Sequence, residues 1–106
     1  TMHDCKAVNK VTLLEYGYAV LECVAWDHLT VKRLIGLTIF AINVGKDGAC
    51  NSQAVQYINR GQYAQGCRLI AYKFDGTPNW SYAGGKFVQG LFNRRKAEVA
   101  LCNATT

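Results

Sequence analysis

Hydrophobic and polar positions follow three different patterns along the 106-residue chain. Residues 8–24 are rich in Val, Leu and Tyr, and a break at residues 15–18 divides them into two short strands. Apolar side chains then recur every three or four residues, which is typical of an amphipathic helix of about 15 residues. This stripe consists of Val31, Leu34, Ile35, Thr38 and Ile42.

Local signals set the limits of this predicted helix. Asp27 is a candidate N-cap, and the segment Asn43–Gly45 supplies a stop. Lys32 and Arg33 fall on its polar side. Gly36 weakens the helix by about 1 kcal/mol relative to Ala, and the β-branched residues between 37 and 42 leave a strand open as an alternative.

The second half of the chain alternates in the manner of strands. Residues 45–52 have the composition of a loop, and turn-forming residues occupy 75–79 and 93–96. The predicted strands between them are 54–58, 68–74, 86–92 and 97–102. We therefore expect an α+β fold, in which one helix packs on a central antiparallel sheet and a short N-terminal β-hairpin is added.

Composition fits one folded domain over residues 1–106. Half of the residues are hydrophobic and 18% are charged, which excludes a disordered chain. The longest nearly apolar run, residues 34–44, is too short to span a membrane. The net charge of +5 either attracts phosphate or an acidic partner or simply keeps the domain soluble. The local cluster Arg94-Arg95-Lys96 favours the first interpretation.

Five cysteines, an odd number, stand at positions 5, 23, 50, 67 and 102. No two have the C-x-x-C spacing and only two histidines are present, so we expect no metal site and no cofactor. The cysteines are either buried thiols or disulfides of an oxidising compartment. Two glycosylation sequons, at Asn79 and Asn103, are compatible with secretion. We interpret the polar start of the chain as a mature form after removal of a signal peptide.

Catalytic groups are sparse. A Cys–His nucleophile would need His28 beside Cys23, and a carboxylate pair would need Glu22 near Glu98. Solvated positions on strands explain the two glutamates more simply. Aromatic and basic residues are instead interleaved. The rings either stack on bases while the cations hold phosphates, or contact a protein partner, or form a core of strand aromatics. The expected binding residues are Tyr57, Arg60, Arg68, Tyr72, Lys86, Arg94, Arg95 and Lys96.

The order of motifs from Tyr16 to Cys102 resembles that of the small guanyl-specific fungal ribonucleases. The motifs that carry the resemblance are the segments 54–58, 61–66, 68–72, 87–93 and 99–102. The resemblance implies a microbial ribonuclease-like fold over residues 16–102, preceded by an extension of residues 1–15.

The same resemblance implies that the catalytic acid and base are missing. Gln56 falls at the position of the general base, Arg68 matches the arginine that stabilises the transition state, and Asn93 replaces the general acid. Gln and Asn do not exchange protons near neutral pH, so we expect a pseudo-ribonuclease that is not an enzyme.

A basic, catalytically degenerate domain of this kind is similar to the RNase-like effectors associated with haustoria of cereal powdery mildew fungi. The similarity implies a secreted virulence effector, or avirulence protein, that acts in the host plant cell cytoplasm. Its expected partners are host RNA, ribosomes or proteins, and an intracellular NLR immune receptor in resistant plants; we expect a monomer that binds no membrane. Two alternatives remain open: an active secreted ribonuclease that cleaves single-stranded RNA, and a pore-forming or cell-wall-directed toxin.

The resemblance also implies a disulfide pairing. Cys23 and Cys102 lie at the two ends of the ribonuclease-like unit, and a bridge between them would stabilise the fold by about 4 kcal/mol. Of the three remaining cysteines, Cys5, Cys50 and Cys67, at most two can pair and one stays a free thiol. Cys50–Cys67 is the expected second bridge, and the other pairings of these three stay open.

Overall fold

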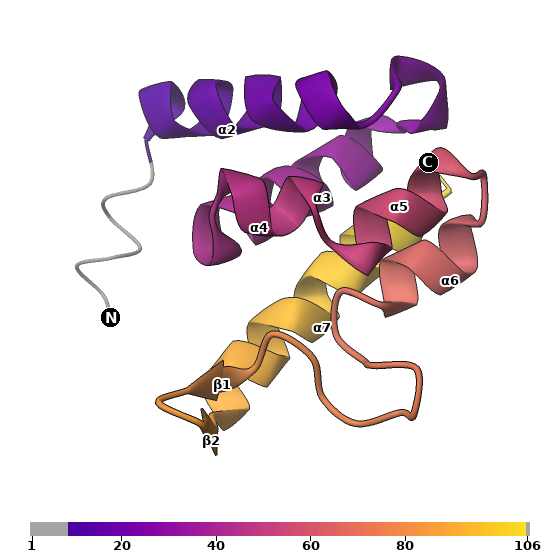
Figure 1. Cartoon of the computed structure of the whole chain (residues 1–106). Helices are drawn as coiled ribbons and strands as arrows, with labels where there is room; N and C mark the ends of the chain where they lie inside the picture. Colours follow the sequence, from indigo (N-terminus) through magenta and orange to yellow (C-terminus); the bar gives the residue numbers. More distant parts are fainter. Residues whose placement is uncertain (1–8, 106) are drawn as a thin grey trace.

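Helices dominate the computed structural model, which describes residues 9–105. In Figure 1, α2 lies across one end of the molecule, α3 lies beneath it, and α7 runs from the β1–β2 hairpin to the C-terminus. The elements are α2 (Lys10–Cys23), the 3₁₀ turn η1 (Trp26–His28), α3 (Val31–Val44), α4 (Lys46–Cys50), α5 (Gln53–Asn59), α6 (Tyr63–Arg68), β1 (Tyr82–Ala83), β2 (Lys86–Phe87) and α7 (Gln89–Asn103).

The expected helix between η1 and residue 45 is confirmed as α3. Its N-cap is Thr30 rather than Asp27, because the Thr30 side chain accepts a hydrogen bond from the Arg33 N–H at 3.0 Å. Asp27 lies within η1. Gly45 ends α3 with a φ of 93°, which a residue without a side chain adopts without strain.

The buried face of α3 differs from the predicted stripe. Val31 and Ile35 are 75% and 43% exposed, whereas Leu37 and Phe40 are fully buried. Arg33, expected on the polar side, is also buried. The reason is that α3 packs between α2 and α7, so its neighbours on two sides decide which positions are covered.

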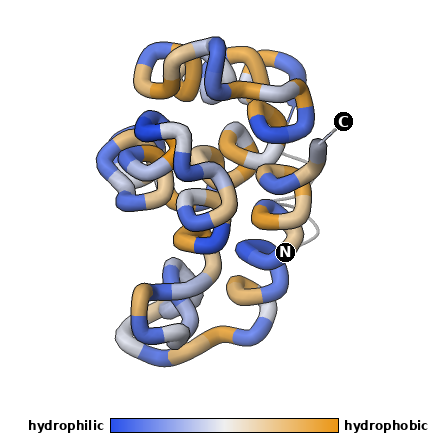
Figure 2. The backbone as a smooth tube through the Cα atoms, turned by 90° about the vertical axis from the view of Figure 1, so that its right-hand side faces the viewer, coloured by the Kyte–Doolittle hydropathy of each residue, from blue (hydrophilic) through white to orange (hydrophobic). Residues whose placement is uncertain are grey.

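Helix α2 replaces the expected N-terminal hairpin. Asn9 caps it by accepting a hydrogen bond from the Thr12 N–H at 3.0 Å. Val20 is its one fully buried side chain. The coloured tube of Figure 2 shows hydrophobic and hydrophilic residues mixed along the helices. Several apolar side chains of α2 are exposed. They include Val11, Leu14, Tyr18 and Leu21.

The central antiparallel sheet does not exist in the described residues. Segment 54–58 lies in α5, where Ala54, Val55 and Ile58 are buried with helical rather than alternating spacing. Residues 68–74 form the end of α6 and a loop, and residues 93–102, expected as a turn and a strand, lie in α7. The one two-stranded pairing joins Tyr82 to Phe87 and Ala83 to Lys86. The α+β, ribonuclease-like fold is therefore wrong, and the chain is mostly helical.

Loop predictions have mixed outcomes. The loop expected at 45–52 contains the short helix α4. The turn at 75–79 is confirmed: the Gly76 N–H donates to the Lys73 carbonyl, and the Lys73 N–H donates to the Thr77 carbonyl. The boundary expected between the N-terminal extension (residues 1–15) and the ribonuclease-like unit (residues 16–102) falls inside α2.

Two disulfides tie the helices together, in a pairing that the sequence did not predict. Cys23 pairs with Cys50, and Cys67 pairs with Cys102. The expected bridges Cys23–Cys102 and Cys50–Cys67 are therefore wrong, because they were inferred from a strand order that the chain does not have. Cys5 lies outside the described residues.

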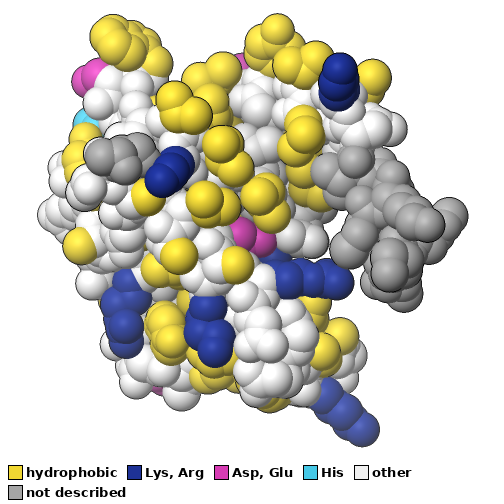
Figure 3. All heavy atoms as spheres, turned by 180° about the vertical axis from the view of Figure 1, so that it is seen from behind, with side chains coloured by type: hydrophobic (Ala, Val, Ile, Leu, Met, Phe, Trp, Pro, Cys, Tyr) yellow, Lys and Arg dark blue, Asp and Glu magenta, His cyan; other side chains and the backbone are white. Residues whose placement is uncertain are grey.

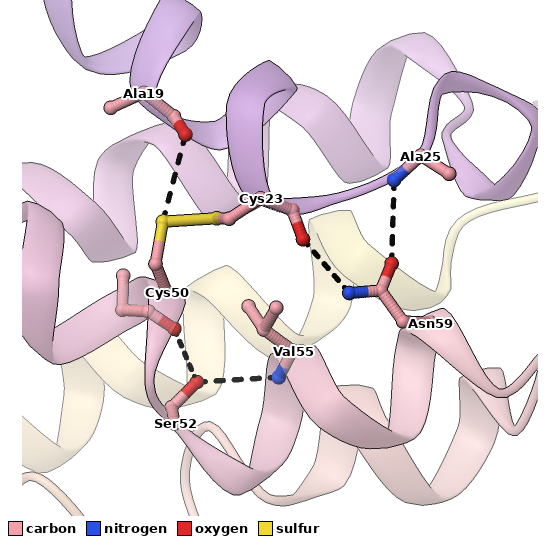
Figure 4. Close-up of a disulfide and its surroundings, with 8 residues drawn as sticks. Ala19, Cys23, Ala25, Cys50, Ser52, Val55 and Asn59 are labelled. Carbon is pink, nitrogen blue, oxygen red and sulfur yellow. Dashed lines mark hydrogen bonds between the residues drawn. A yellow bond between two sulfur atoms is a disulfide. The ribbon is translucent and has the colours of Figure 1, made fainter.

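The first disulfide anchors the end of α2, as Figure 4 shows. It connects α2 to the end of α4, and Asn59 of α5 reinforces it. The Asn59 side chain donates to the Cys23 carbonyl at 2.8 Å and accepts from the Ala25 N–H at 3.3 Å. The last turn of α2 is thus fixed by one covalent bond and two hydrogen bonds.

Between residues 9 and 105, each helix is too short or too polar to span a lipid bilayer.

Candidate functional site

Aromatic and basic side chains form two groups of contacts. The first joins α5 to the loop 69–81, and the second joins α6, the same loop, the β1–β2 hairpin and α7. The first group begins on α5, where the Arg60 guanidinium lies 5.1 Å from the centre of the Tyr57 ring. The Tyr57 ring in turn packs against Phe74 of the loop at 5.7 Å. Phe74 is 57% exposed, so this contact leaves one side of the ring open to solvent.

Four further rings form the second group of contacts. Tyr72 packs edge-on against Phe92 at 5.5 Å, Phe92 against Phe87 at 5.8 Å, and Phe87 against Tyr82 at 6.0 Å. Such edge-to-face pairs stabilise one another by about 0.5–1.5 kcal/mol beyond their buried area. These ring contacts therefore hold the exposed β1–β2 hairpin against the first turns of α7.

Cations flank these rings. Arg68 lies 4.4 Å from the Tyr72 ring centre, Lys73 lies 5.4 Å from that of Tyr82, and Lys96 lies 4.7 Å from that of Phe92. All three side chains are exposed, so their charges face solvent while they contact the aromatic faces.

We name this set the basic–aromatic surface. Figure 3 shows the side of the molecule opposite to that of Figure 1, and Lys and Arg side chains lie among apolar ones over its lower half as well. The members of the surface are Tyr57, Arg60, Arg68, Tyr72, Lys73, Phe74, Tyr82, Phe87, Phe92 and Lys96.

Most of the binding residues expected from the sequence lie on or beside this surface. Tyr57, Arg60, Arg68, Tyr72 and Lys96 are members of it. Lys86 lies on β2 and Arg94 on α7, and both are exposed.

Arg95 has a different environment, since it is only 2% exposed. Its Nε and Nη2 donate to the two carboxylate oxygens of Glu98 at 2.6 and 2.8 Å, and its Nη1 donates to the Trp80 carbonyl at 3.3 Å. With these donors engaged inside the protein, the described structure gives Arg95 a packing role.

Glu98 of α7 is a buried carboxyl group whose pKa is shifted by its surroundings. It is 1% exposed, and Asn43 of α3 also donates to its Oε2 at 3.0 Å. Burial raises the pKa of Glu98 above its usual value, although the hydrogen bonds from Arg95 and Asn43 act in the opposite direction. Both oxygens are engaged by neighbouring side chains, so we assign Glu98 to the link between α3 and α7.

The degenerate ribonuclease positions lie on three separate helices. Gln56 is on α5, Arg68 ends α6, and Asn93 is on α7, where its side chain accepts a hydrogen bond from Gln89 at 2.9 Å. They were aligned as neighbours on a sheet, and the sheet is absent from the described part of the chain.

The other catalytic alternatives have no support in the geometry. Cys23 is in a disulfide, and His28 is hydrogen-bonded to the Tyr63 hydroxyl at 2.7 Å. Glu22 is exposed whereas Glu98 is buried, so the two carboxyl groups do not share one environment as a catalytic pair would. Among residues 9–105, no group of three His, Cys, Asp or Glu side chains is arranged to hold a metal ion.

Among the loop and hairpin members of the surface, the binding residues expected from the sequence include Tyr72 but not Phe74 or Phe87. Phe74 was placed at the end of a predicted strand and Phe87 inside another, where each ring has the usual role of core packing. The signal available was the turn at 75–79, which places Phe74 at the start of an exposed loop.

Comparison with known proteins gives a consistent family assignment. The sequence profile described as "Phage lysozyme" matches residues 1–98. The endolysin of Bacillus phage PZA is 40% identical over 78 residues, which are 74% of this chain and 28% of that protein. The SAR-endolysin of Escherichia phage Mu is 31% identical over 86 residues, 81% of this chain and 46% of that protein. The SAR-endolysin of Bacteriophage PS119 is 29% identical over 102 residues, 96% of this chain and 56% of that protein.

These matches overturn the resemblance to fungal ribonucleases and to RNase-like powdery mildew effectors. The relatives are phage endolysins, so the expected pseudo-ribonuclease, virulence effector and avirulence protein are wrong. The expected NLR receptor, host RNA or ribosome, and plant cell cytoplasm are wrong for the same reason. The short motifs behind the resemblance consist mainly of Gly, Tyr, Phe, Gln and aliphatic residues, which recur in unrelated folds.

Proposed function

This chain belongs to the phage lysozyme family, and on that premise we propose that it acts on the bacterial cell wall as part of an enzyme that degrades peptidoglycan. The family match over residues 1–98 is the observation that carries the proposal. The chain spans between about a quarter and just over half of the length of the three relatives described above. We assign to the described residues the part of this function that their geometry supports, namely holding the polymer.

The basic–aromatic surface supports this assignment. Peptidoglycan consists of amino-sugar strands with short peptides that carry free carboxylates. Exposed cations such as Arg68 and Lys96 attract such a polymer, and the protein's net charge of +5 adds to the attraction. Aromatic rings next to these cations offer apolar faces to the sugars.

The environments of two carboxyl groups, Glu98 and Glu15, do not favour a role in bond cleavage. Glycoside hydrolysis needs a protonated carboxyl group within reach of the sugar oxygen. Glu98 has the raised pKa of such an acid, but it is buried and both of its oxygens are hydrogen-bonded. Glu15 is held by an exposed ion pair with Lys46 at 2.7 Å.

Co-sedimentation with purified bacterial sacculi tests the proposal. We expect the chain to pellet with the sacculi at low salt and to be released as salt rises, because exposed charges are screened. The variant Arg68→Glu/Lys96→Glu should bind at least ~10-fold more weakly, since it places like charges against the polymer.

A matched control is available on the other side of the fold. Lys10→Glu/Lys32→Glu makes the same change in net charge at exposed positions of α2 and α3. It should keep most of the binding. A chain that does not pellet with sacculi at any salt concentration contradicts the proposed function, and equal loss in both double variants contradicts the assignment to this surface.

A further inference from the structure

A shallow open hollow lies beside Phe74, between the first residue of α5 and the loop that follows α6. Gln53, Lys73, Phe74, Asp75 and Asn79 line it. Phe74 belongs to both the hollow and the basic–aromatic surface, and its ring packs against that of Tyr57, with the ring centres 5.7 Å apart. The remaining lining residues supply two amides, one cation and one carboxylate.

Backbone hydrogen bonds hold the loop that carries most of this lining. The Lys73 N–H donates to the Thr77 carbonyl at 2.8 Å, and the Asn79 N–H donates to the Ala71 carbonyl at 2.8 Å. Gly76 makes the turn with a φ of 87°, a conformation that glycine adopts without strain. A loop held in this way loses little conformational entropy when a ligand binds.

Side-chain bonds fix the polar groups of the hollow as well. Asn79 Nδ2 donates to the Leu69 carbonyl at 2.9 Å, which orients the amide. Asp75 Oδ1 accepts from both the N–H and the hydroxyl of Thr77, at 2.9 and 2.6 Å. These bonds lower the pKa of Asp75, so its carboxylate is ionised at neutral pH and Oδ2 remains an acceptor.

From this arrangement we infer that the hollow is a subsite for one neutral amino sugar of the glycan strand, with the sugar ring stacked on Phe74. An aromatic face with a few converging polar groups is the usual composition of a small-ligand site. Asp75 accepts hydrogen bonds from sugar hydroxyls, while the amides of Gln53 and Asn79 match hydroxyl and acetamido groups. Lys73 and Asp75 cancel in charge, which favours a neutral sugar over the anionic peptide of the same polymer.

The inference rests on the proposed function and names the chemistry of one part of its surface. The test is a titration of the whole chain with the neutral tetramer of N-acetylglucosamine, followed by NMR chemical shifts of backbone amides. We expect saturable shifts at residues 73–79 and at Gln53. Phe74→Ala should weaken binding at least ~10-fold, and Phe74→Tyr, which keeps the ring, should restore it to within about threefold.

Tyr18→Ala is the matched control, because Tyr18 is 63% exposed on α2 and Phe74 is 57% exposed. It should bind the tetramer as the unaltered chain does. The inference is overturned if Phe74→Ala binds the tetramer equally well, or if a peptidoglycan tetrapeptide occupies the hollow in preference to the sugar. Sedimentation with sacculi separates the two proposals: binding to sacculi without a sugar response at Phe74 leaves the proposed function intact and removes the subsite.

Discussion

Arg95 and Glu98 form a bidentate ion pair inside the protein, one turn apart on α7. Two guanidinium nitrogens meet the two carboxylate oxygens at 2.6 and 2.8 Å, and neither side chain is more than 2% exposed. Asn43 of α3 donates to the same carboxylate, so the pair also joins two helices. The position of these charges in the core has consequences that mutation and pH can test.

Removing Arg95 should destabilise the fold strongly at neutral pH. Arg95→Leu leaves the Glu98 carboxylate buried without its cation, a change that typically costs about 3–5 kcal/mol. Urea denaturation at pH 7 measures the loss. The double variant Arg95→Leu/Glu98→Leu should recover most of it, since it leaves no buried charge, and failure to recover contradicts the ion-pair explanation.

Ionisation of Glu98 should make the free energy of unfolding depend on pH. Burial raises the pKa of Glu98 in the folded protein above its unfolded value. Its contribution to stability is therefore fully present below the unfolded pKa and is lost as pH rises through the folded pKa. We expect the free energy of unfolding of the unaltered chain, minus that of Glu98→Gln, to fall as pH rises above the ordinary glutamate pKa of about 4.3. A difference that rises with pH contradicts the prediction.

Two disulfides should each contribute substantially to stability. The bridged cysteines are 27 and 35 residues apart, and loops of this length correspond to about 4 kcal/mol per bridge in the chain-entropy model. Cys67→Ala/Cys102→Ala should lower the free energy of unfolding by roughly this amount. Mass spectrometry of a non-reduced digest checks the pairing directly, and a peptide linking Cys23 to Cys102 would refute it.

Gly36 should resist replacement by Ala although it lies inside a helix. A Cβ atom there would come within 2.9 Å of the Glu98 carbonyl oxygen and 3.1 Å of the Cys102 nitrogen, so α3 and α7 would have to separate. Overpacking costs more than the helix gains, and we expect a net loss of about 1–2 kcal/mol.

Gly17→Ala on α2 is the matched comparison for this prediction. Its new Cβ would meet only the Thr38 hydroxyl, at an ordinary 3.8 Å. This variant should be as stable as the unaltered chain or up to ~1 kcal/mol more stable. Thermal unfolding of both variants decides the matter, and a stabilised Gly36→Ala would contradict the close approach of the two helices.

The elements that depend on local sequence were predicted from it, namely the helix α3 and the turn at 75–79. Helix α3 has a sustained apolar period and ends at Gly45, and the turn at 75–79 contains Asp, Gly and Pro. The helices α5 and α6 are only 7 and 6 residues long. A segment such as 54–58 is too short for its period to separate a helix from a strand.

Two longer helices were missed because their patterns conceal the buried face. On α7 the buried side chains include Arg95 and Glu98, which look like a solvated face in sequence. On α2 apolar residues occur on the exposed side as well, so no single stripe marks the core. Neither pattern can be resolved without knowing which helices pack beside them.

The same division applies to the candidate site. The sequence by itself established a basic chain with interleaved aromatic residues. Its pattern predicted Tyr57, Arg60 and Arg68 among the binding candidates. Only the tertiary structure decided that Phe74 joins them, that Arg95 does not, and that Cys23 pairs with Cys50. The physical reason is that residue type and local spacing determine helices and turns, whereas burial and pairing depend on contacts between segments far apart in the chain.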